Sequence, residues 1–306
     1  MNSLDFAFEG FRIIRSKPHV VLAWGLLLLI GNSLALYALT SMAGPALQSL
    51  QHLQAQSPAA VDQAAVMALM PPILSAYAIA LPILVITDSL AACAVYRAVL
   101  GREDGKFAYL GLGMAEVRQI VAGILFLLII LALMLACLIC VSVVAGILAA
   151  VTGVSSAALG YLSGFIAMAF VAVFVLRLSF FGVQTFDEGR INLFGSWRIT
   201  RGRAWRLATG YLIAGIMVML VYLLCFAIFA AFAVGFNGGD IKVLDPILNG
   251  DTVNMAMFRS PVMIAYLVVA NGLVGPLTLA ISAGAPAAAY LSLRGEPVPA
   301  RTENVF

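Results

Sequence analysis

One pair of cysteines, Cys137-x-x-Cys140, has the spacing of a metal site or a redox couple. Both thiols stand in a run of leucine, isoleucine and alanine, and no histidine, acid or lysine flanks them. The other two cysteines, Cys93 and Cys225, also lie in apolar runs. We therefore interpret all four as small apolar packing residues, and expect neither a metal ion nor a cofactor.

Residues for acid–base or nucleophilic catalysis are scarce. The two histidines, His19 and His52, form no His-x-x-x-His or His-Glu-x-x-His pattern. Ser163 lies in Tyr161-Leu162-Ser163-Gly164, which weakly resembles the setting of a nucleophilic serine, but no base accompanies it. No phosphate-binding loop is present. The sequence thus predicts no catalytic residue, and we expect a protein that is not an enzyme.

Three aspartates, Asp240, Asp245 and Asp251, share a glycine-containing segment. Acidic side chains on a loop can bind calcium, but this spacing fits no EF-hand. We interpret the three as solvated loop residues.

Two charged residues, Asp88 and Arg177, stand inside long apolar runs. A charge at membrane depth is costly, so each needs a partner or a function. Asp88 lies nine residues before Arg97, and Arg177 lies ten before Asp187, which places both at similar depth if the two runs cross in the same direction. We predict that they pair across the bundle or line a shared polar cavity. A structural pair and a proton or ion relay both stay open, although the runs offer a relay no further titratable partners.

The elements that must position these residues follow from composition. Hydrophobic residues make up 63% of the 306 residues and charged residues only 10%, whereas a soluble domain is about a quarter charged. The chain therefore has to expose most of its surface to lipid, and we predict an all-α, polytopic membrane bundle. Six apolar segments are long enough to cross a bilayer: 19–43, 71–99, 120–151, 159–186, 207–236 and 261–293.

These segments predict one transmembrane domain built from three helical hairpins. Its parts are an interfacial N-terminal helix (1–18), hairpin 1 (19–99), a cytoplasmic connection with hairpin 2 (100–186), a basic connection with hairpin 3 (187–293) and a tail (294–306). The first run exceeds the apolar core of a signal peptide, so we expect it to be retained. In the N-terminal helix, Leu4, Phe8, Phe11 and Ile14 share one face.

Between the first two spans, segment 44–70 has leucines at three-residue spacing: Leu47, Leu50 and Leu53. We predict a short amphipathic helix there, on the outer membrane surface or capping the bundle.

The basic residues set the orientation. With the N-terminus in the cytoplasm, fourteen of the 17 lysines and arginines fall on the cytoplasmic side, only Lys242 and Arg259 fall outside, and Arg177 lies within a span. By the positive-inside rule, we predict that both termini are cytoplasmic.

The chain also shows an internal repeat. At a constant offset, Phe11, Arg12 and Arg15 match Trp197, Arg198 and Arg201, and each set leads into an outward-going span. At a second constant offset, the returning spans match, in Pro82/Pro276, Asp88/Ser282 and Tyr96/Tyr290. We predict three parallel units, each an interfacial segment followed by a hairpin.

Two further features bear on function. Pro82, Pro276 and Pro286 are expected to break or kink their helices, either beside a cavity or for close packing. Segment 190–206 mixes arginine with tryptophan, which suits anionic lipid headgroups but is also expected of any positive-inside loop. Nucleic acid is not expected there. The proposed headgroup-binding residues are Arg190, Trp197, Arg198, Arg201, Arg203, Trp205 and Arg206.

Some of these stretches carry a family resemblance: Phe11-Arg12-x-x-Arg15-x-Lys17-Pro18, Phe186-Asp187-Glu188-Gly189 and Ser196-Trp197-x-x-Thr200-Arg201-Gly202. They resemble bacterial inner-membrane proteins related to the membrane domain of glycerophosphodiester phosphodiesterases. The resemblance implies a bacterial cytoplasmic membrane and a link to envelope lipids. Only thirteen residues follow Leu293, so we expect no phosphodiesterase domain.

Two hypotheses follow. The first is a non-catalytic inner-membrane protein in lipid handling or envelope homeostasis, or a membrane scaffold, with membrane lipids (anionic ones among them) or a membrane protein as partners. The second is a small-solute or proton-coupled transporter that uses Asp88 and Arg177.

Overall fold

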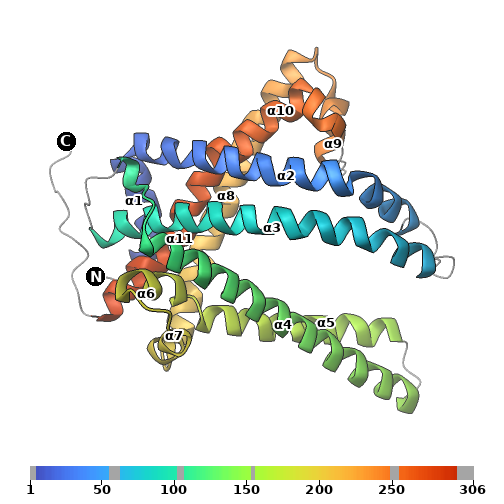
Figure 1. Ribbon diagram of the computed structural model, residues 1–306, viewed down its shortest axis with the longest axis horizontal. Helices are drawn as coiled ribbons and strands as arrows, with labels where there is room; N and C mark the ends of the chain where they lie inside the picture. Colours follow the sequence, from blue (N-terminus) through green and yellow to red (C-terminus); the bar gives the residue numbers. More distant parts are fainter. Residues whose placement is uncertain (1–4, 55–62, 102–106, 153–155, 249–254, 295–306) are drawn as a thin grey trace.

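The computed structural model describes residues 5–54, 63–101, 107–152, 156–248 and 255–294 (Figure 1). Within these ranges the chain is helical and contains no strand. Six helical segments are long and apolar enough to cross a membrane. The predicted all-α, multi-pass bundle is therefore confirmed.

The six segments form three hairpins. The first pairs α2 (Pro18–Gln54) with α3 (Gln63–Leu100), and the second pairs α4 (Met114–Thr152) with α5 (Ser156–Arg177), which a tight turn joins to α6 (Phe181–Glu188). The third pairs α8 (Ala204–Phe236) with a composite last span of α10 (Pro261–Leu267), a π-helical turn (Val268–Val274) and α11 (Gly275–Arg294).

Short helical elements connect the spans. They are η1 (Asp5–Phe8), α1 (Glu9–Ser16), η3 (Phe107–Tyr109), α7 (Leu193–Thr200), η4 (Ile241–Leu244), α9 (Asp245–Leu248) and η5 (Met255–Arg259).

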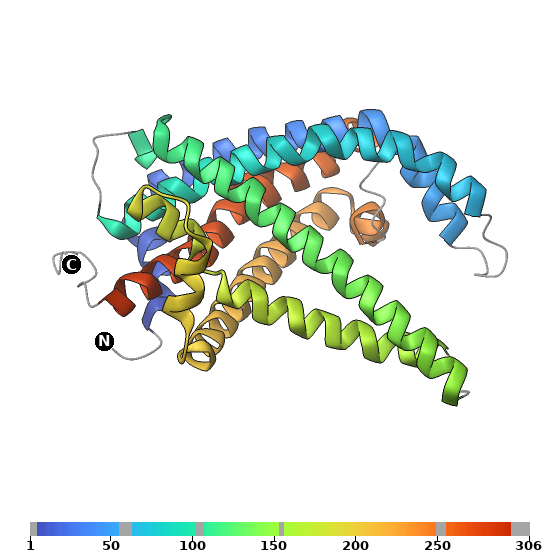
Figure 2. The same ribbon diagram turned by 60° about the horizontal axis from the view of Figure 1, so that its bottom comes forward.

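Helices α2, α3 and α4 are longer than a bilayer requires. They contain 37, 38 and 39 residues, which at 1.5 Å per residue is roughly 55–60 Å, against about 30 Å of hydrocarbon. They must tilt strongly or extend beyond the membrane. Figures 1 and 2 show that the α4–α5 hairpin also diverges from the α2–α3 hairpin away from α6 and α7.

The predicted separate amphipathic helix over 44–70 is wrong for the described part of that segment. α2 continues through Pro45 to Gln54, and α3 already begins at Gln63. The apolar residues of the two extensions pack on each other, with Leu47 and Leu50 of α2 beside Leu69 and Met70 of α3. Leu47 and Leu50 thus contact a neighbouring helix. Residues 55–62 lie outside the described residues.

The N-terminal arm packs one of its faces into the bundle. Its predicted position at the membrane interface stays a prediction, and Leu4 of the expected apolar face lies outside the described residues. Its buried face is Phe6, Ala7, Gly10 and Ile13, whereas Phe8 of the expected apolar face is exposed. The arm packs on α11 and α8. The reason is steric, because Gly10 allows its helix to approach the backbone of α11 closely.

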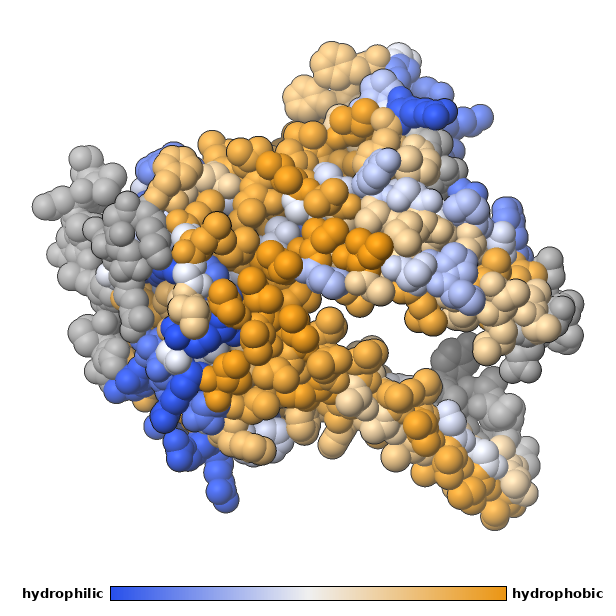
Figure 3. Space-filling model, viewed as in Figure 1, coloured by the Kyte–Doolittle hydropathy of each residue, from blue (hydrophilic) through white to orange (hydrophobic). Residues whose placement is uncertain are grey.

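The main core lies where this arm meets the bundle. Trp24, Phe180, Ile281 and Tyr290 are almost fully buried there. The small residues of α11 let α1, α3 and α8 approach it closely. Elsewhere the long helices expose large apolar side chains. Figure 3 shows a broad apolar surface, with polar residues gathered at the end that carries α6 and α7 and again near α9 and α10. We call the end with α6 and α7 the basic end, because the exposed arginines of segment 190–206 lie there.

The helix boundaries follow the offsets of the predicted repeat. α2 begins at Pro18 and α8 at Ala204, the same spacing that separates Phe11 from Trp197. α3 ends at Leu100 and α11 at Arg294, the same spacing that separates Pro82 from Pro276. Among the described residues, the short η3 precedes the middle hairpin, and the repeat stays a prediction.

Candidate functional site

A buried ion pair joins α3 to α4 at the basic end. The guanidinium of Arg97 donates to the carboxylate of Glu116, and both side chains are only 2% exposed. Arg97 also donates to the carbonyl of Tyr109 at 2.9 Å and lies 5.3 Å from the centroid of the Phe186 ring. One arginine therefore holds together α3, α4, η3 and α6.

The η3 turn is held in a left-handed conformation, with φ of +51° at Ala108 and +61° at Tyr109. Non-glycine residues adopt this region only when neighbours compensate for the strain. Here the indole of Trp24 donates to the Ala108 carbonyl at 2.9 Å, and the ammonium of Lys17 donates to the Tyr109 hydroxyl. The turn is thus fastened to hairpin 1.

Arg177 has different partners from the one that the sequence suggested. Its guanidinium donates to the carbonyl of Thr200 at 2.8 Å and lies 5.6 Å from the centroid of the Trp197 ring. Its own carbonyl accepts from the Ser196 hydroxyl at 2.8 Å. Arg177 ends α5, so its side chain reaches the C-terminal end of α7, where a cation stabilises the last carbonyls.

Asp88 does not pair with Arg177. It lies on an exposed part of α3, and no described residue forms a hydrogen bond or ion pair with it. The direct pair predicted from the sequence is therefore replaced by a contact between Arg177 and α7, and Asp88 remains a carboxylate on the surface of a span.

The arginine-rich segment 190–206 presents its charges outward. Arg198, Arg201, Arg203 and Arg206 are exposed, and the Trp205 side chain is 87% exposed. The other two predicted residues are more constrained, since Arg190 pairs with Glu188 at 2.8 Å and Trp197 packs on Phe174, with ring centroids 5.2 Å apart. The four exposed arginines and Trp205 are the residue types that bind anionic lipid headgroups.

The last span is interrupted where Pro276 was expected to break it. The π-helical turn Val268–Val274 precedes α11, in which Pro276 is the second residue. By contrast, Pro82 lies inside the continuous α3, and Pro286 inside the continuous α11.

The π-helical turn makes a polar contact in the middle of the bundle. The amide nitrogen of Asn32 on α2 donates to the amide oxygen of Asn271 at 3.0 Å. Gly25 lies so close that an added Cβ would be 2.1 Å from the carbonyl oxygen of Gly272. The sequence reasoning missed both asparagines, although two amides inside apolar runs were a usable signal.

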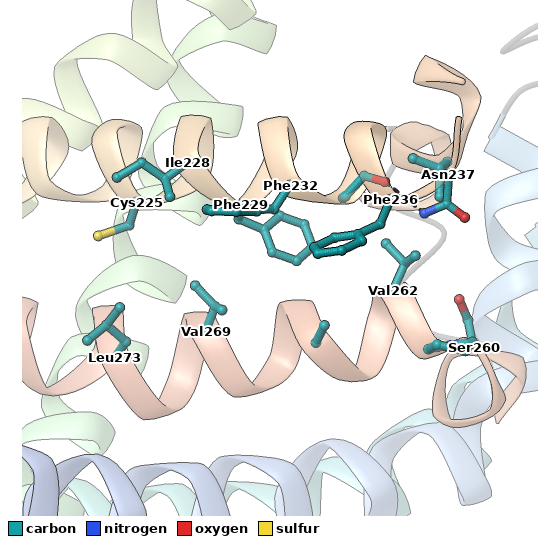
Figure 4. Close-up of a pocket in the computed structure, with 14 residues that line it drawn as sticks. Cys225, Ile228, Phe229, Phe232, Phe236, Asn237, Ser260, Val262, Val269 and Leu273 are labelled. Atoms are coloured by element: carbon teal, nitrogen blue, oxygen red, sulfur yellow. Dashed lines mark hydrogen bonds between the residues drawn. The ribbon is translucent and has the colours of Figure 1, made fainter. Parts of the chain in front are cut away.

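A groove of about 760 Å³ lies between α8 and the last span (Figure 4). Phe229, Phe232 and Phe236 face it from α8, and Val262 and Val269 face it from the last span. Apolar side chains make up most of its lining, and polar groups come mainly from one end. There Asn237 donates to the Ala233 carbonyl at 2.7 Å and Ser260 caps α10.

The remaining sequence candidates are dispersed. No group of three or more histidine, cysteine or acidic side chains that could hold a metal ion occurs within the described ranges, and Cys93, Cys137, Cys140 and Cys225 are free thiols. Asp240 accepts from the backbone N–H of Lys242 at 3.0 Å, while Asp251 and the side chain of Ser163 lie outside the described part of the chain.

Comparisons with protein-family models, curated proteins and solved structures found no match for the chain. The resemblance to the membrane domain of glycerophosphodiester phosphodiesterases stays a prediction.

Proposed function

We propose that this protein is a non-catalytic lipid-binding protein of a bacterial inner membrane. In this proposal the groove between α8 and the last span takes an acyl chain, and the arginine-rich segment binds anionic headgroups. The observation that carries the proposal is the groove itself, an apolar concavity within the membrane-spanning part of the chain.

A groove between two membrane-spanning segments is surrounded by the acyl chains of the bilayer. Its volume of about 760 Å³ falls within the range of about 300–1,000 Å³ typical of ligand sites. The phenylalanines that line it offer a large apolar surface with few rotatable bonds. Dispersion contacts between these rings and a chain would replace the looser contacts between two lipid chains.

The polar end of the groove suits the polar part of a lipid. If the N-terminus is cytoplasmic, α8 runs outward and the groove lies in the outer half of the membrane. Asn237 and Ser260 then stand at its outer end, where they can form hydrogen bonds with the ester or headgroup of a lipid whose chain fills the apolar part.

The proposal is tested with a substitution that fills the groove with a larger side chain. Ala265 lines it and is exposed, so Ala265→Phe should occupy the space of the chain without disturbing the core. Ala227→Phe on α8 adds the same ring outside the lining residues and is the matched control. Protein extracted gently from its own membrane is analysed by native mass spectrometry for co-purifying phospholipid.

Wild-type protein and Ala227→Phe are expected to retain lipid, and Ala265→Phe to lose most of it. Equal lipid retention by all three proteins, each shown to be monodisperse, would refute binding in the groove.

One observation favours the second hypothesis, transport. Asp88 is a carboxylate within a span that no described residue pairs with, and isolated acids at membrane depth often serve ion or proton pathways. Arg177, the expected second group, is engaged with α7. A transporter would therefore depend on Asp88, and Asp88→Asn should abolish uptake while leaving expression intact.

A further inference from the structure

A second cavity, of about 220 Å³, lies among α3, α4 and the α5–α6 junction. It shares no lining residue with the groove. Its polar side chains are Tyr96, Gln119 and Ser179. None of its lining residues is charged, and the others are Ala122, Gly123, Phe126, Val175, Leu178, Phe181 and Gly182.

The Gln119 side chain is the strongest sign that the cavity is built to hold something. It is only 7% exposed, and its carbonyl oxygen is buried without a hydrogen-bond partner among the described residues. Buried amides in native proteins are nearly always hydrogen-bonded, so an unpaired one points to a partner that the chain itself does not supply.

Tyr96 brings a second unpaired group to the same place. Its ring is buried beside Phe186, and its hydroxyl forms no hydrogen bond with any residue that the structure describes. A Cβ added at Gly182 would lie 2.7 Å from this hydroxyl and 2.9 Å from the amide nitrogen of Gln119. Glycine at this position therefore leaves room for the two polar groups, which converge beside it.

Ser179 completes the polar lining. Its oxygen accepts a hydrogen bond from the Tyr211 hydroxyl at 3.0 Å, and its own proton can still be donated. Together the three side chains offer both donors and acceptors to one small volume.

The charge of the surroundings selects the ligand. Arg97, which follows Tyr96 in the chain, is paired with Glu116, and Arg118, which precedes Gln119, is not among the residues that line the cavity. A carboxylate or ammonium in the cavity would meet no opposite charge among the lining side chains, which is strongly unfavourable for a buried charge. A carboxylate could also not donate to the Gln119 oxygen. A hydroxyl both donates and accepts, so one such group can pair with Gln119 and Tyr96 together.

We propose that this cavity binds one small, uncharged alcohol, with its hydroxyl between Gln119 and Tyr96 and its hydrocarbon part against Phe126 and Leu178. The proposal does not depend on lipid binding in the groove, because the two sites have separate linings.

Photolabelling of the full chain tests the site. The probe is a short aliphatic alcohol that carries a diazirine, and the control probe is the same molecule with a methyl group in place of the hydroxyl. After reconstitution in lipid nanodiscs and illumination, peptide mass spectrometry maps the label. Label from the alcohol is expected on the segments around Tyr96, Gln119 and Gly182, and excess unlabelled short-chain alcohol should compete with it.

Two substitutions make the test specific. Tyr96→Phe removes only a hydroxyl, and Gln119→Leu removes the amide at similar size. Each should lower the labelling at the cavity by about fivefold, the effect of one neutral hydrogen bond. Gln51→Leu, at an exposed position of α2, is the matched control, and Ala265→Phe in the groove should leave the labelling unchanged.

Equal labelling at the cavity by the alcohol and by its methyl analogue would overturn the proposal, as would wild-type labelling of a folded Tyr96→Phe protein. If Gln119→Leu does not fold, the result with Tyr96→Phe decides. Label spread evenly over the lipid-facing helices, without competition, would mean that the cavity holds water only.

Discussion

Arg97 and Glu116 form an ion pair that is almost completely withdrawn from solvent. Removing two charges from water is costly, so such a pair adds little net stability, but loss of one partner leaves an uncompensated buried charge. Because Arg97 also holds the η3 turn through the Tyr109 carbonyl, the pair fixes how hairpins 1 and 2 meet at the basic end.

Glu116→Leu should therefore destabilise the bundle by about 3–5 kcal/mol. The measurement is unfolding of the purified protein in mixed micelles at increasing SDS. The double variant Arg97→Met, Glu116→Leu should regain much of the loss, since it removes both charges.

The exposed pair of Arg190 and Glu188 is the matched control. The Arg190 side chain is 71% exposed, so Arg190→Leu should change stability by less than about 1 kcal/mol. A single Glu116→Leu variant as stable as wild type would show that the buried pair does not couple the hairpins.

Gly10 is expected to tolerate no side chain. A Cβ there would lie 2.4 Å from the Cα of Ile281 and 2.5 Å from the carbonyl oxygen of Ala280, and backbone atoms cannot move aside as a flexible side chain would. Gly10→Ala should displace the N-terminal arm and cost about 1–3 kcal/mol. Thermal unfolding, with limited proteolysis of the arm, measures the effect.

Gly146→Ala is the control for this prediction. An added Cβ at Gly146 in α4 would meet nothing within 4 Å, and alanine favours a helix over glycine by up to about 1 kcal/mol. This variant should be as stable as wild type or slightly more stable. Equal stability of the Gly10→Ala and wild-type proteins would contradict close packing of the arm on α11.

The spans were predictable because lipid imposes a simple rule. Every apolar run of about 20 residues must be helical to pair its backbone groups, and charge scarcity marked six such runs. Proline after Gly275 in an apolar segment also indicated the interruption near Pro276, and the π-helical turn lies beside it.

Tertiary contacts decided the rest. The burial of the N-terminal arm depends on the approach of Gly10 to Gly284, which no hydrophobic period reveals. Sequence spacing predicted a common depth for Arg177 and Asp88, but it could not predict which way their side chains point. The turn after α5 places the Arg177 side chain against α7. The groove and the small cavity arise from how helices diverge, which composition does not encode.

Asp88 and Arg177 should behave as independent sites. Arg177→Gln removes the hydrogen bond to the Thr200 carbonyl and is expected to loosen α7, whereas Asp88→Asn touches no described partner. Substitutions without shared contacts are additive within about 0.5 kcal/mol. Unfolding of the two single variants and the double variant tests this, and a larger coupling energy would restore the predicted pair.

The orientation in the membrane can be tested with one residue at each end of α8. Arg203 precedes α8, and Lys242 lies in η4 beyond its other end; both are exposed. In a cysteine-free background, Lys242→Cys should react with a membrane-impermeant maleimide on intact cells. Arg203→Cys should react only after permeabilisation. The reverse pattern would place the basic end outside and contradict the charge bias of the sequence.

Neutralising the arginine-rich segment should weaken the retention of anionic lipid. Arg198, Arg201 and Arg203 are exposed, and a basic residue near an anionic surface contributes about 1 kcal/mol. Replacing all three by glutamine should therefore lower the affinity for anionic lipid by roughly 150-fold at most. Added salt should narrow the difference because it screens exposed charges. Native mass spectrometry after exposure to mixed anionic and zwitterionic lipid gives the retained fractions.

The double variant Lys242→Gln, Arg259→Gln is the control. It removes positive charge in η4 and η5, which connect α8 to α10 at the end of α8 away from the arginine-rich segment. It should leave retention at the basic end unchanged. The triple glutamine variant should unfold like wild type, since the Arg177–Thr200 and Arg97–Glu116 contacts are untouched. If the triple variant retains as much anionic lipid as wild type, these arginines do not bind headgroups and only orient the protein in the membrane. Lipid binding would then depend on the groove alone.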